Sequence, residues 1–186
     1  MNVKTVERAE LLDLLKEHAV RHGRFILASG AESSYYIDAK LATLIPRGFQ
    51  LIGRVMAQTL KDEGIDYDAV GGLESGAIAV ACSVASASPA SIFFVRRNRK
   101  EHGTQKWIEG PLQKDQRVLI VEDVVTTGSS VIKAIKQVQE FGAQIVKVLV
   151  LVDRLRHAEE NIIRECGSSF SYEAIFTITD LGVEPT

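Results

Sequence analysis

The sequence is poor in cysteine and carries little net charge, and each shortage excludes a class of protein. Its two cysteines, Cys82 and Cys166, lie far apart and form no CxxC pair, so a zinc site is not expected. We expect both to be reduced thiols. The formal net charge of the 186 residues is −2. A nucleic-acid partner is not expected, because proteins that bind nucleic acid usually present a strongly basic face or tail.

Long apolar runs are also missing. None approaches the roughly 20 residues that a membrane-spanning helix needs. Residues 1–10 are polar and of mixed charge, without the apolar centre of a secretion signal. We therefore expect no membrane partner and a cytoplasmic location. Hydrophobic residues make up 46% and charged residues 25% of the chain, an ordinary balance for a globular protein, and we interpret residues 1–186 as a single domain.

Strand-like and helix-like segments alternate along most of the chain. Apolar residues at helical spacing, together with glycine or proline at the ends, predict helices at Val6–His22, Phe49–Glu63, Ala77–Ser86, Ser129–Phe141 and Glu159–Cys166. Short β-rich or apolar runs predict strands at Arg24–Ala28, Ser34–Ala39, Tyr67–Gly71, Ser91–Val95, Arg117–Val121, Ile145–Val152 and Ala174–Ile178. This order predicts an α/β fold with a central, mostly parallel sheet flanked by helices.

Residues 96–116 do not fit this alternation. They are polar, have no clear period, and contain Gly103, Gly110 and Pro111. Loops longer than about 12–15 residues are uncommon in compact domains and are usually functional. We therefore expect a mobile functional loop here.

The segment from Val118 to Ser130 carries the strongest indication of chemistry. A buried strand delivers Glu122 and Asp123 to its carboxyl end, where open α/β sheets bind ligands. The loop 126–130 then offers four hydroxyl groups, the backbone N–H groups of a helix start, and a glycine that permits close approach, all of which suit a phosphate. The acids suit hydroxyl groups or a cation beside that phosphate, and a phosphate beside a diol is a sugar phosphate. The alternative is a capped helix after two solvated acids.

A second cluster lies at the start of the long loop, where four cations and a histidine occur within seven residues. Such a cluster can surround a pyrophosphate, whose charge must be stabilised as it leaves, and a loop that closes over it excludes water. The alternative is an ordinary solvated basic loop. The residues are Arg96, Arg97, Arg99, Lys100 and His102.

Residues 118–130 resemble the phosphoribosyl pyrophosphate (PRPP) signature of the type I phosphoribosyltransferases. The basic loop resembles the Arg-Lys/Arg-x-x-Lys-x-His-Gly segment of the orotate phosphoribosyltransferases, and the resemblance extends over nearly the whole chain. It implies a type I phosphoribosyltransferase-like fold with a small N-terminal hood over about residues 1–45. The implied reaction is the transfer of the phosphoribosyl group from PRPP to orotate, giving orotidine 5′-monophosphate and pyrophosphate in pyrimidine biosynthesis. The implied cofactor is Mg²⁺, bound mainly through PRPP and not directly by the protein.

The resemblance also implies a homodimer in which each loop is shared between two sites, and it assigns roles to residues. Lys100, His102 and Asp123 are expected to be catalytic. A larger set is expected to bind PRPP: Arg96, Arg97, Lys100, His102, Glu122, Asp123, Val124, Val125, Thr126, Thr127, Gly128, Ser129 and Ser130.

Four residues are expected to bind orotate, whose carboxylate distinguishes it from uracil and the purines. Arg154 follows an apolar strand, and an arginine there can pair with a carboxylate in bidentate fashion. Thr126, Tyr35 and Tyr36 complete the set on the strength of the resemblance. Because adjacent residues of a strand point to opposite faces, we expect only one of the two tyrosines to meet the ligand.

The sequence departs from some members of the family, and it leaves two other functions open. Ala28 and Ser75 stand where some relatives have lysine, and Glu122 replaces the more usual aspartate. The glycine-rich turn 71–77 falls where the family has its pyrophosphate loop. Without that lysine, the pyrophosphate is expected to depend on Arg96, Arg97, Lys100 and Mg²⁺ more than on this turn. The alternatives are a phosphoribosyltransferase for another base and a non-catalytic PRPP-binding regulator.

Overall fold

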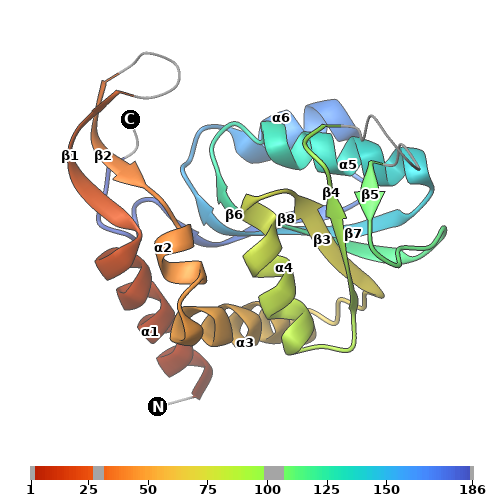
Figure 1. The fold of residues 1–186 in the computed structure, drawn as a ribbon, viewed down its shortest axis with the longest axis horizontal. Coiled ribbons are helices and arrows are strands. Elements are labelled where there is room, and N and C mark those ends of the chain that lie inside the picture. The colour runs from red at the N-terminus through yellow and green to blue at the C-terminus, as the bar shows by residue number, and fades with distance from the viewer. Residues whose placement is uncertain (1–2, 27–31, 99–106, 185–186) are drawn as a thin grey trace.

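A computed structural model describes residues 3–26, 32–98 and 107–184. Its main feature is a six-stranded sheet with the strand order β5-β4-β3-β6-β7-β8, parallel except for β5, which is antiparallel to β4 (Figure 1). The strands of this sheet are β3 (Ala69–Leu73), β4 (Ser91–Val95), β5 (Ile108–Glu109), β6 (Arg117–Val125), β7 (Gln144–Asp153) and β8 (Ser171–Thr177). The helices are α1 (Val3–His18), α2 (Lys40–Thr43), α3 (Pro46–Asp62), α4 (Gly76–Ser86), α5 (Ser129–Phe141) and α6 (Ala158–Cys166).

Helices cover both faces of the sheet, as Figure 1 shows. Side chains of α1, α3 and α4 pack in one apolar cluster with Leu119 and Leu149. Side chains of α5 and α6 pack in a second cluster with Ile120 and Val148. Successive residues of β6 and β7 therefore enter opposite cores, because side chains of a strand alternate between faces. These two apolar layers confirm the predicted α/β fold.

The hairpin of β1 (Val20–Ile26) and β2 (Glu32–Ile37) forms a separate two-stranded antiparallel sheet. The prediction of a helix from residue 6 to 22 was wrong at its end, because α1 stops at His18. Val20 instead pairs with Ile37 across the hairpin, so a partner distant in sequence overrides the local helical pattern. With α1 and α2, this hairpin makes up the segment that we expected as a hood.

Most strands are displaced by a few residues from their predicted bounds, and β6 and β5 show why. β6 continues past Val121 to Val125, because its last residues still pair with β7, where Val125 lies opposite Asp153. Within the stretch expected to be a loop, Ile108 pairs with Val95 to form β5. A two-residue strand has too short a pattern to be found in the sequence.

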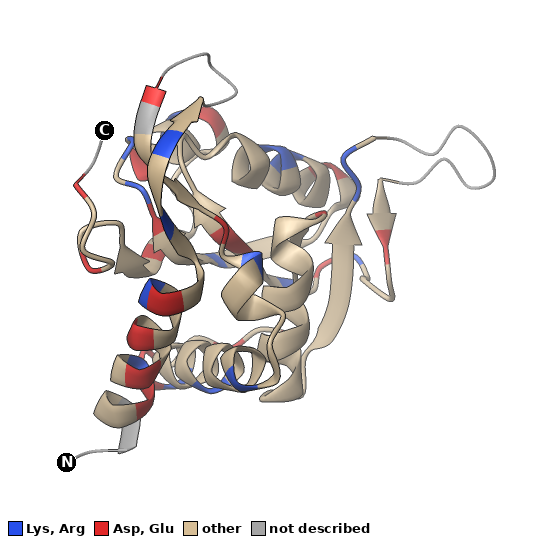
Figure 2. Ribbon diagram, turned by 60° about the vertical axis from the view of Figure 1, so that its left-hand side comes forward, with Lys and Arg blue, Asp and Glu red and all other residues tan. Residues whose placement is uncertain are grey.

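Charges of both signs are interspersed along α1 and over the rest of the ribbon (Figure 2). No described helix is long and apolar enough to cross a membrane. Both cysteines are free thiols.

Within residues 3–26, 32–98 and 107–184, Lys147 is a buried cation. Lys147 on β7 is 3% exposed, and its Nζ lies 2.6 Å from Glu63 Oε2, after α3, and 2.6 Å from Glu173 Oε2, on β8. Burial lowers the pKa of Lys147, but the hydrogen bonds and charges of the two carboxylates outweigh it and hold the pKa above its ordinary value. This ion triad joins α3 to two strands of the sheet.

Replacement of Lys147 by alanine should destabilise the protein by about 3 kcal/mol, because removing one partner of a buried ion pair leaves its charges uncompensated. Breaking a buried ion pair typically costs about 3–5 kcal/mol. We expect the lower value because both glutamates keep partial contact with water. Urea unfolding measures it. Lys136→Ala is the matched control, since Lys136 pairs with Glu165 on the surface and should change stability little; equal midpoints for the two variants would contradict the prediction.

Candidate active site

Two adjacent acids occupy the carboxyl-terminal part of β6. Glu122 and Asp123 are 5% and 7% exposed. The Asp123 N–H donates to Glu122 Oε1 at 3.2 Å, and the Val124 N–H donates to Asp123 Oδ1 at 2.7 Å. Burial raises the pKa of Glu122 well above its ordinary value, and the negative charge of Asp123 raises it further. The free protein therefore resists carrying two full charges at this point.

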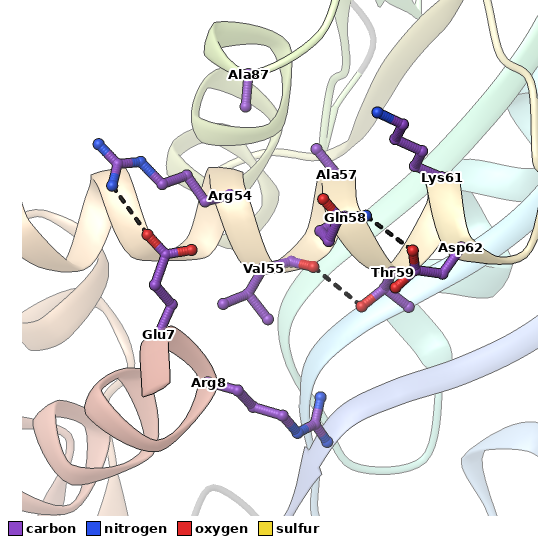
Figure 3. Close-up of a pocket in the computed structure, with 10 residues that line it drawn as sticks. All are labelled: Glu7, Arg8, Arg54, Val55, Ala57, Gln58, Thr59, Lys61, Asp62 and Ala87. Atoms are coloured by element: carbon purple, nitrogen blue, oxygen red, sulfur yellow. Dashed lines mark hydrogen bonds and ion pairs between the residues drawn. The ribbon is translucent and has the colours of Figure 1, made fainter. Parts of the chain in front are cut away.

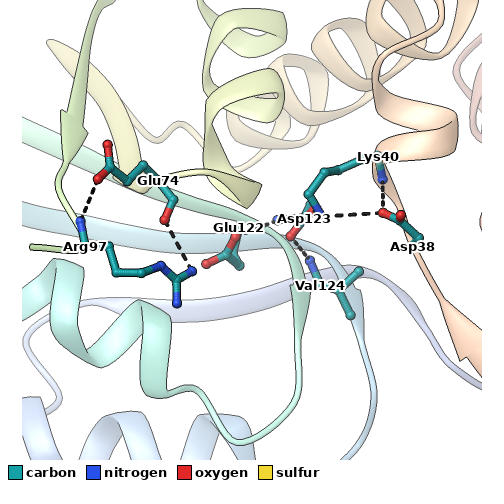
Figure 4. Close-up of polar contacts among 7 residues, drawn as sticks. All are labelled: Asp38, Lys40, Glu74, Arg97, Glu122, Asp123 and Val124. Carbon is teal, nitrogen blue, oxygen red and sulfur yellow. Dashed lines mark hydrogen bonds and ion pairs between the residues drawn. The ribbon is translucent and has the colours of Figure 1, made fainter. Parts of the chain in front are cut away.

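A polar cavity of 160 Å³ surrounds these acids. Its lining residues come from the ends of β3 and β6, from the starts of α2, α4 and α5, and from the segment after β4: Lys40, Leu73, Glu74, Ser75, Gly76, Arg97, Glu122, Asp123, Val124 and Ser130. Figure 4 shows Arg97 and Lys40 on opposite sides of the two acids. The Arg97 N–H donates to Glu74 Oε1 at 2.9 Å, and its guanidinium donates to the Glu74 carbonyl at 3.4 Å.

Gly76, the first residue of α4, makes room for the acids. A Cβ atom at this position would lie 2.5 Å from Asp123 Oδ1 and 2.6 Å from Glu122 Oε1. Both carboxylates therefore lie against the amino end of α4, where the helix dipole favours negative charge. This close approach gives the physical reason for a glycine in the turn 71–77.

The phosphate loop predicted at residues 126–130 leads from β6 into α5. Gly128 takes a left-handed conformation with φ +85°, and α5 has no side-chain hydrogen bond capping its amino end. The alternative of an ordinary capped helix is therefore not what the structure shows. Asn161 of α6 donates to the Thr127 carbonyl at 3.1 Å, so α6 supports the loop from behind. The N–H groups at the start of α5 suit an anion.

Arg154 lies at the end of β7, beside the phosphate loop, because its N–H donates to the Val125 carbonyl at 3.0 Å. Its guanidinium donates to Tyr35 Oη at 3.3 Å and lies 5.4 Å from the centre of that ring. The buried Nε of Arg154 has no hydrogen-bond partner within the described residues. A buried donor left in this state favours a ligand with an acceptor group.

Of the two tyrosines, the structure brings Tyr35 to Arg154 and turns Tyr36 away. Tyr35 is 2% exposed, whereas Tyr36 is 45% exposed and packs its ring against Phe25 at 5.6 Å. The alternation of side chains along β2 places them on opposite faces, as the sequence predicted.

The basic loop is only partly described. Arg96 pairs with Glu109 of β5 at 3.2 Å, and it does not line the cavity around the acids, whereas Arg97 does. Lys100 and His102 lie outside the described residues. Their catalytic roles therefore stay predictions.

Sequence reasoning missed Lys40. Its Nζ lies 3.9 Å from Asp123 Oδ2 and 3.4 Å from Asp38 Oδ1 (Figure 4). Burial lowers the pKa of Lys40, but the charges of Asp123 and Asp38 outweigh it and raise the pKa above its ordinary value. Lys40 begins a four-residue helix, and nothing in the local pattern marks it apart from its place two residues after Asp38.

A larger groove of 680 Å³ lies between α1 and α3 and contains none of the predicted site residues (Figure 3). Two pairs of its polar side chains are engaged with each other. Arg54 donates to Glu7 at 2.9 Å, and Gln58 donates to Asp62 at 2.8 Å. We therefore place the active site at the acids of β6 and not in this groove.

The residues present could hold a metal ion only if a bound substrate supplied part of its coordination. Among the residues that the structure describes, no three His, Cys, Asp or Glu side chains form a group that could hold a metal. Mg²⁺ commonly takes one or two carboxylates, several waters and the phosphates of a substrate. Glu122 and Asp123 suit that arrangement.

Known proteins with similar sequences and structures identify the family. The model of the phosphoribosyl transferase domain matches residues 43–179, so the chain is a member of the phosphoribosyltransferases. It is 44% identical to the orotate phosphoribosyltransferase of Methanocaldococcus jannaschii, over 86% of this chain and 89% of that one. It is 41% identical to that of Corynebacterium glutamicum, over 98% and 97%. The chain belongs to the orotate phosphoribosyltransferase family.

A solved structure agrees with this assignment. The Mycobacterium tuberculosis H37Rv orotate phosphoribosyltransferase in complex with PRPP superposes with a TM-score of 0.81 at 38% identity, covering 95% of this chain and 99% of that one. The type I phosphoribosyltransferase fold expected from the sequence is therefore confirmed.

Glu122→Gln should stabilise the free protein at pH 8 while it weakens PRPP binding. Because folding raises the pKa of Glu122, its protonated form favours the folded state below the ordinary value of 4.5, and that contribution is lost as the pH rises through the raised value. A neutral amide should recover about 1 kcal/mol at pH 8, or about 2–4 °C in Tm, with a smaller gain near pH 4.

Thermal unfolding at the two pH values and PRPP titration calorimetry measure both effects. Glu165→Gln, at an exposed carboxylate, is the control. A lower Tm for Glu122→Gln at pH 8 would show that the buried charge is already well compensated.

Proposed function

We propose that this chain transfers the phosphoribosyl group from PRPP to orotate and releases pyrophosphate, as a step of pyrimidine biosynthesis. The observation that carries this is the pairing of two features on adjacent strands. β6 ends in buried acids followed by a phosphate loop, and β7 ends in Arg154 with a buried unpartnered Nε. Val125 and Asp153 are register partners, so the PRPP features and the arginine meet at one edge of the sheet.

In this proposal, PRPP lies across the end of β6. Glu122 and Asp123 accept hydrogen bonds from the ribose hydroxyls, and the loop 126–130 holds the 5′-phosphate with its backbone N–H groups and hydroxyls. The M. tuberculosis relative binds PRPP, which supports the same substrate here.

Orotate lies beside the ribose, with its carboxylate on Arg154. The phenol of Tyr35 already contacts the guanidinium at 3.3 Å, so it holds the arginine in place for a planar, bidentate pair. In this proposal Thr126, the first residue of the phosphate loop, also contacts orotate. A purine has no carboxylate and would leave the buried Nε of Arg154 without an acceptor, which argues against the alternative base.

Catalysis rests on orientation and on stabilisation of charge. As the bond from C1 of the ribose to pyrophosphate lengthens, negative charge grows on the leaving group, and a ring nitrogen of orotate loses its N–H proton to solvent as it forms the new bond to C1. Arg97, Lys100 and His102 surround the leaving pyrophosphate, and His102 or Lys100 supplies a proton to it. Mg²⁺, held mainly by PRPP, supplies further positive charge. Asp123 keeps the ribose in register.

We also propose a homodimer in which the loop 96–116 contributes to the partner's site. An apolar cleft of 660 Å³ next to Ser75 and Gly76 supports this. Leu44 and Ile78 on its rim are 67% and 36% exposed, and exposed apolar surface of this kind favours a protein contact. Sedimentation at assay concentration tests it, and a monomer with full activity would contradict it.

A cytoplasmic location is proposed because both thiols are unpaired, as in a reducing compartment. Cell fractionation tests this, and enrichment outside the cytoplasmic fraction would contradict it.

The purified protein should consume orotate only when PRPP and Mg²⁺ are both present. Loss of orotate absorbance, with one pyrophosphate formed per orotate consumed, measures the reaction, and EDTA should abolish it. PRPP binding without turnover of any base would instead favour the non-catalytic regulator. Turnover of a purine but not of orotate would favour the other alternative.

Arg154→Ala should raise the KM for orotate roughly 10- to 100-fold, the range for loss of a charge-assisted hydrogen-bonded pair, with little change in the KM for PRPP. Steady-state kinetics with each substrate varied in turn separates the two. Arg156→Ala is the matched control, because Arg156 is exposed two residues further on. Equal increases in both KM values would contradict a specific contact with orotate.

A further inference from the structure

Acids outnumber cations in the polar cavity, and the contact of Lys40 with Asp123 is a long one. Three acids line the polar cavity, Glu74, Glu122 and Asp123, against two cations, Lys40 and Arg97. The guanidinium of Arg97 is held at the Glu74 carbonyl, at 3.4 Å, and its backbone N–H donates to the Glu74 carboxylate. Lys40 approaches Asp123 only to 3.9 Å, beyond hydrogen-bond distance. Its ammonium group therefore has donors to spare within the site.

The position of Lys40 relative to the acids decides what it can bind. The phosphate loop leaves β6 toward α5, on one face of the sheet, whereas Gly76 and α4 lie on the other. Lys40 lines both the polar cavity and the adjoining apolar cleft, together with Ser75 and Gly76. It is thus on the α4 side of the acids, opposite the loop that suits a 5′-phosphate.

The shape of PRPP fits this division. Its hydroxyls are on C2 and C3 of the ribose, its diphosphate is on C1 and its 5′-phosphate is reached through C4. When the hydroxyl edge lies on the acids and the 5′-phosphate lies over α5, the diphosphate points to the opposite side. On that side Ser75, Gly76 and Lys40 line the apolar cleft next to the polar cavity, and no residue of the phosphate loop lines that cleft.

We propose that Lys40 binds the diphosphate of PRPP and the pyrophosphate product, moving from its long contact with Asp123 to a phosphate oxygen. This rests on the proposed function of the chain. Lys40 thereby supplies a cation from the N-terminal segment to the group that leaves, and it frees Asp123 for the ribose hydroxyls.

A purely structural role for Lys40 explains less. Its side chain is 47% exposed, and its contacts at 3.4 and 3.9 Å to Asp38 and Asp123 are those of a loose surface pair, which adds little to stability. A residue of this kind is not needed to hold α2 in place, because Ala42 and Thr43 of α2 are buried.

The experiment compares two ligands that share only part of PRPP. Calorimetry with Mg²⁺-pyrophosphate and with ribose 5-phosphate is performed on the wild type and on Lys40→Ala. Loss of one charged contact should weaken pyrophosphate binding roughly 10- to 100-fold, whereas ribose 5-phosphate binding should change less than about twofold, because its phosphate lies over α5. Lys40→Arg should retain most of the pyrophosphate affinity.

Lys61→Ala is the matched control, since Lys61 is exposed in the distant groove of Figure 3. Kinetics should agree with the binding data, with a higher KM for PRPP in Lys40→Ala and an unchanged KM for orotate. Unchanged pyrophosphate affinity, or equal weakening of both ligands, would overturn the proposal for Lys40. A wild type that neither binds pyrophosphate nor turns over orotate would instead contradict the proposed function itself.

Discussion

The site depends on the burial of two neighbouring carboxylates at the end of a central strand. Glu122 and Asp123 are almost without solvent, and their mutual repulsion and burial hold the pKa of Glu122 high. A fold retains such an arrangement at a cost to its stability, and proteins accept this cost at functional sites. Hydroxyl donors and a cation relieve it. The site therefore favours a ligand that brings both, and PRPP with Mg²⁺, the substrate and cofactor that we propose, would do so.

Other features follow from that constraint. The carboxylates need a small residue at the start of α4, which Gly76 provides, and the favourable end of a helix dipole, which the same contact supplies. The acids also require β6 to remain a regular strand to its carboxyl end, and its pairing with β7 continues as far as Val125. The same pairing fixes Arg154 beside the phosphate loop, so the specificity for the base is tied to the strand that carries the acids.

The sequence predicted those parts of the fold and the site that are written in consecutive residues. The apolar runs of β6 and β7, the acids and the loop 126–130 lie next to one another in the chain, so their pattern is visible. The end of α1, the strand β5 and the contact of Lys40 with Asp123 depend on partners 17, 13 and 83 residues away. Pairing across such separations leaves no local periodicity in the sequence. Which tyrosine faces Arg154, and whether Lys40 contacts Asp123, depend on the position of the hairpin and could not be predicted from the sequence.

The N-terminal segment is therefore more than a cover for the sheet. Through Tyr35 it holds the guanidinium of Arg154, and through Lys40 it reaches Asp123. In the proposed function these contacts serve the base and the leaving group, while the other residues around the acids come from β3, β6, α4, α5 and the segment after β4. Because the hairpin pairs only with itself, side-chain packing attaches it to the six-stranded sheet, with Tyr35 packed against Ile178 and Val183. The burial of Ala42 and Thr43 fixes α2 in the same way, so the packing of this one segment sets the positions of both Tyr35 and Lys40.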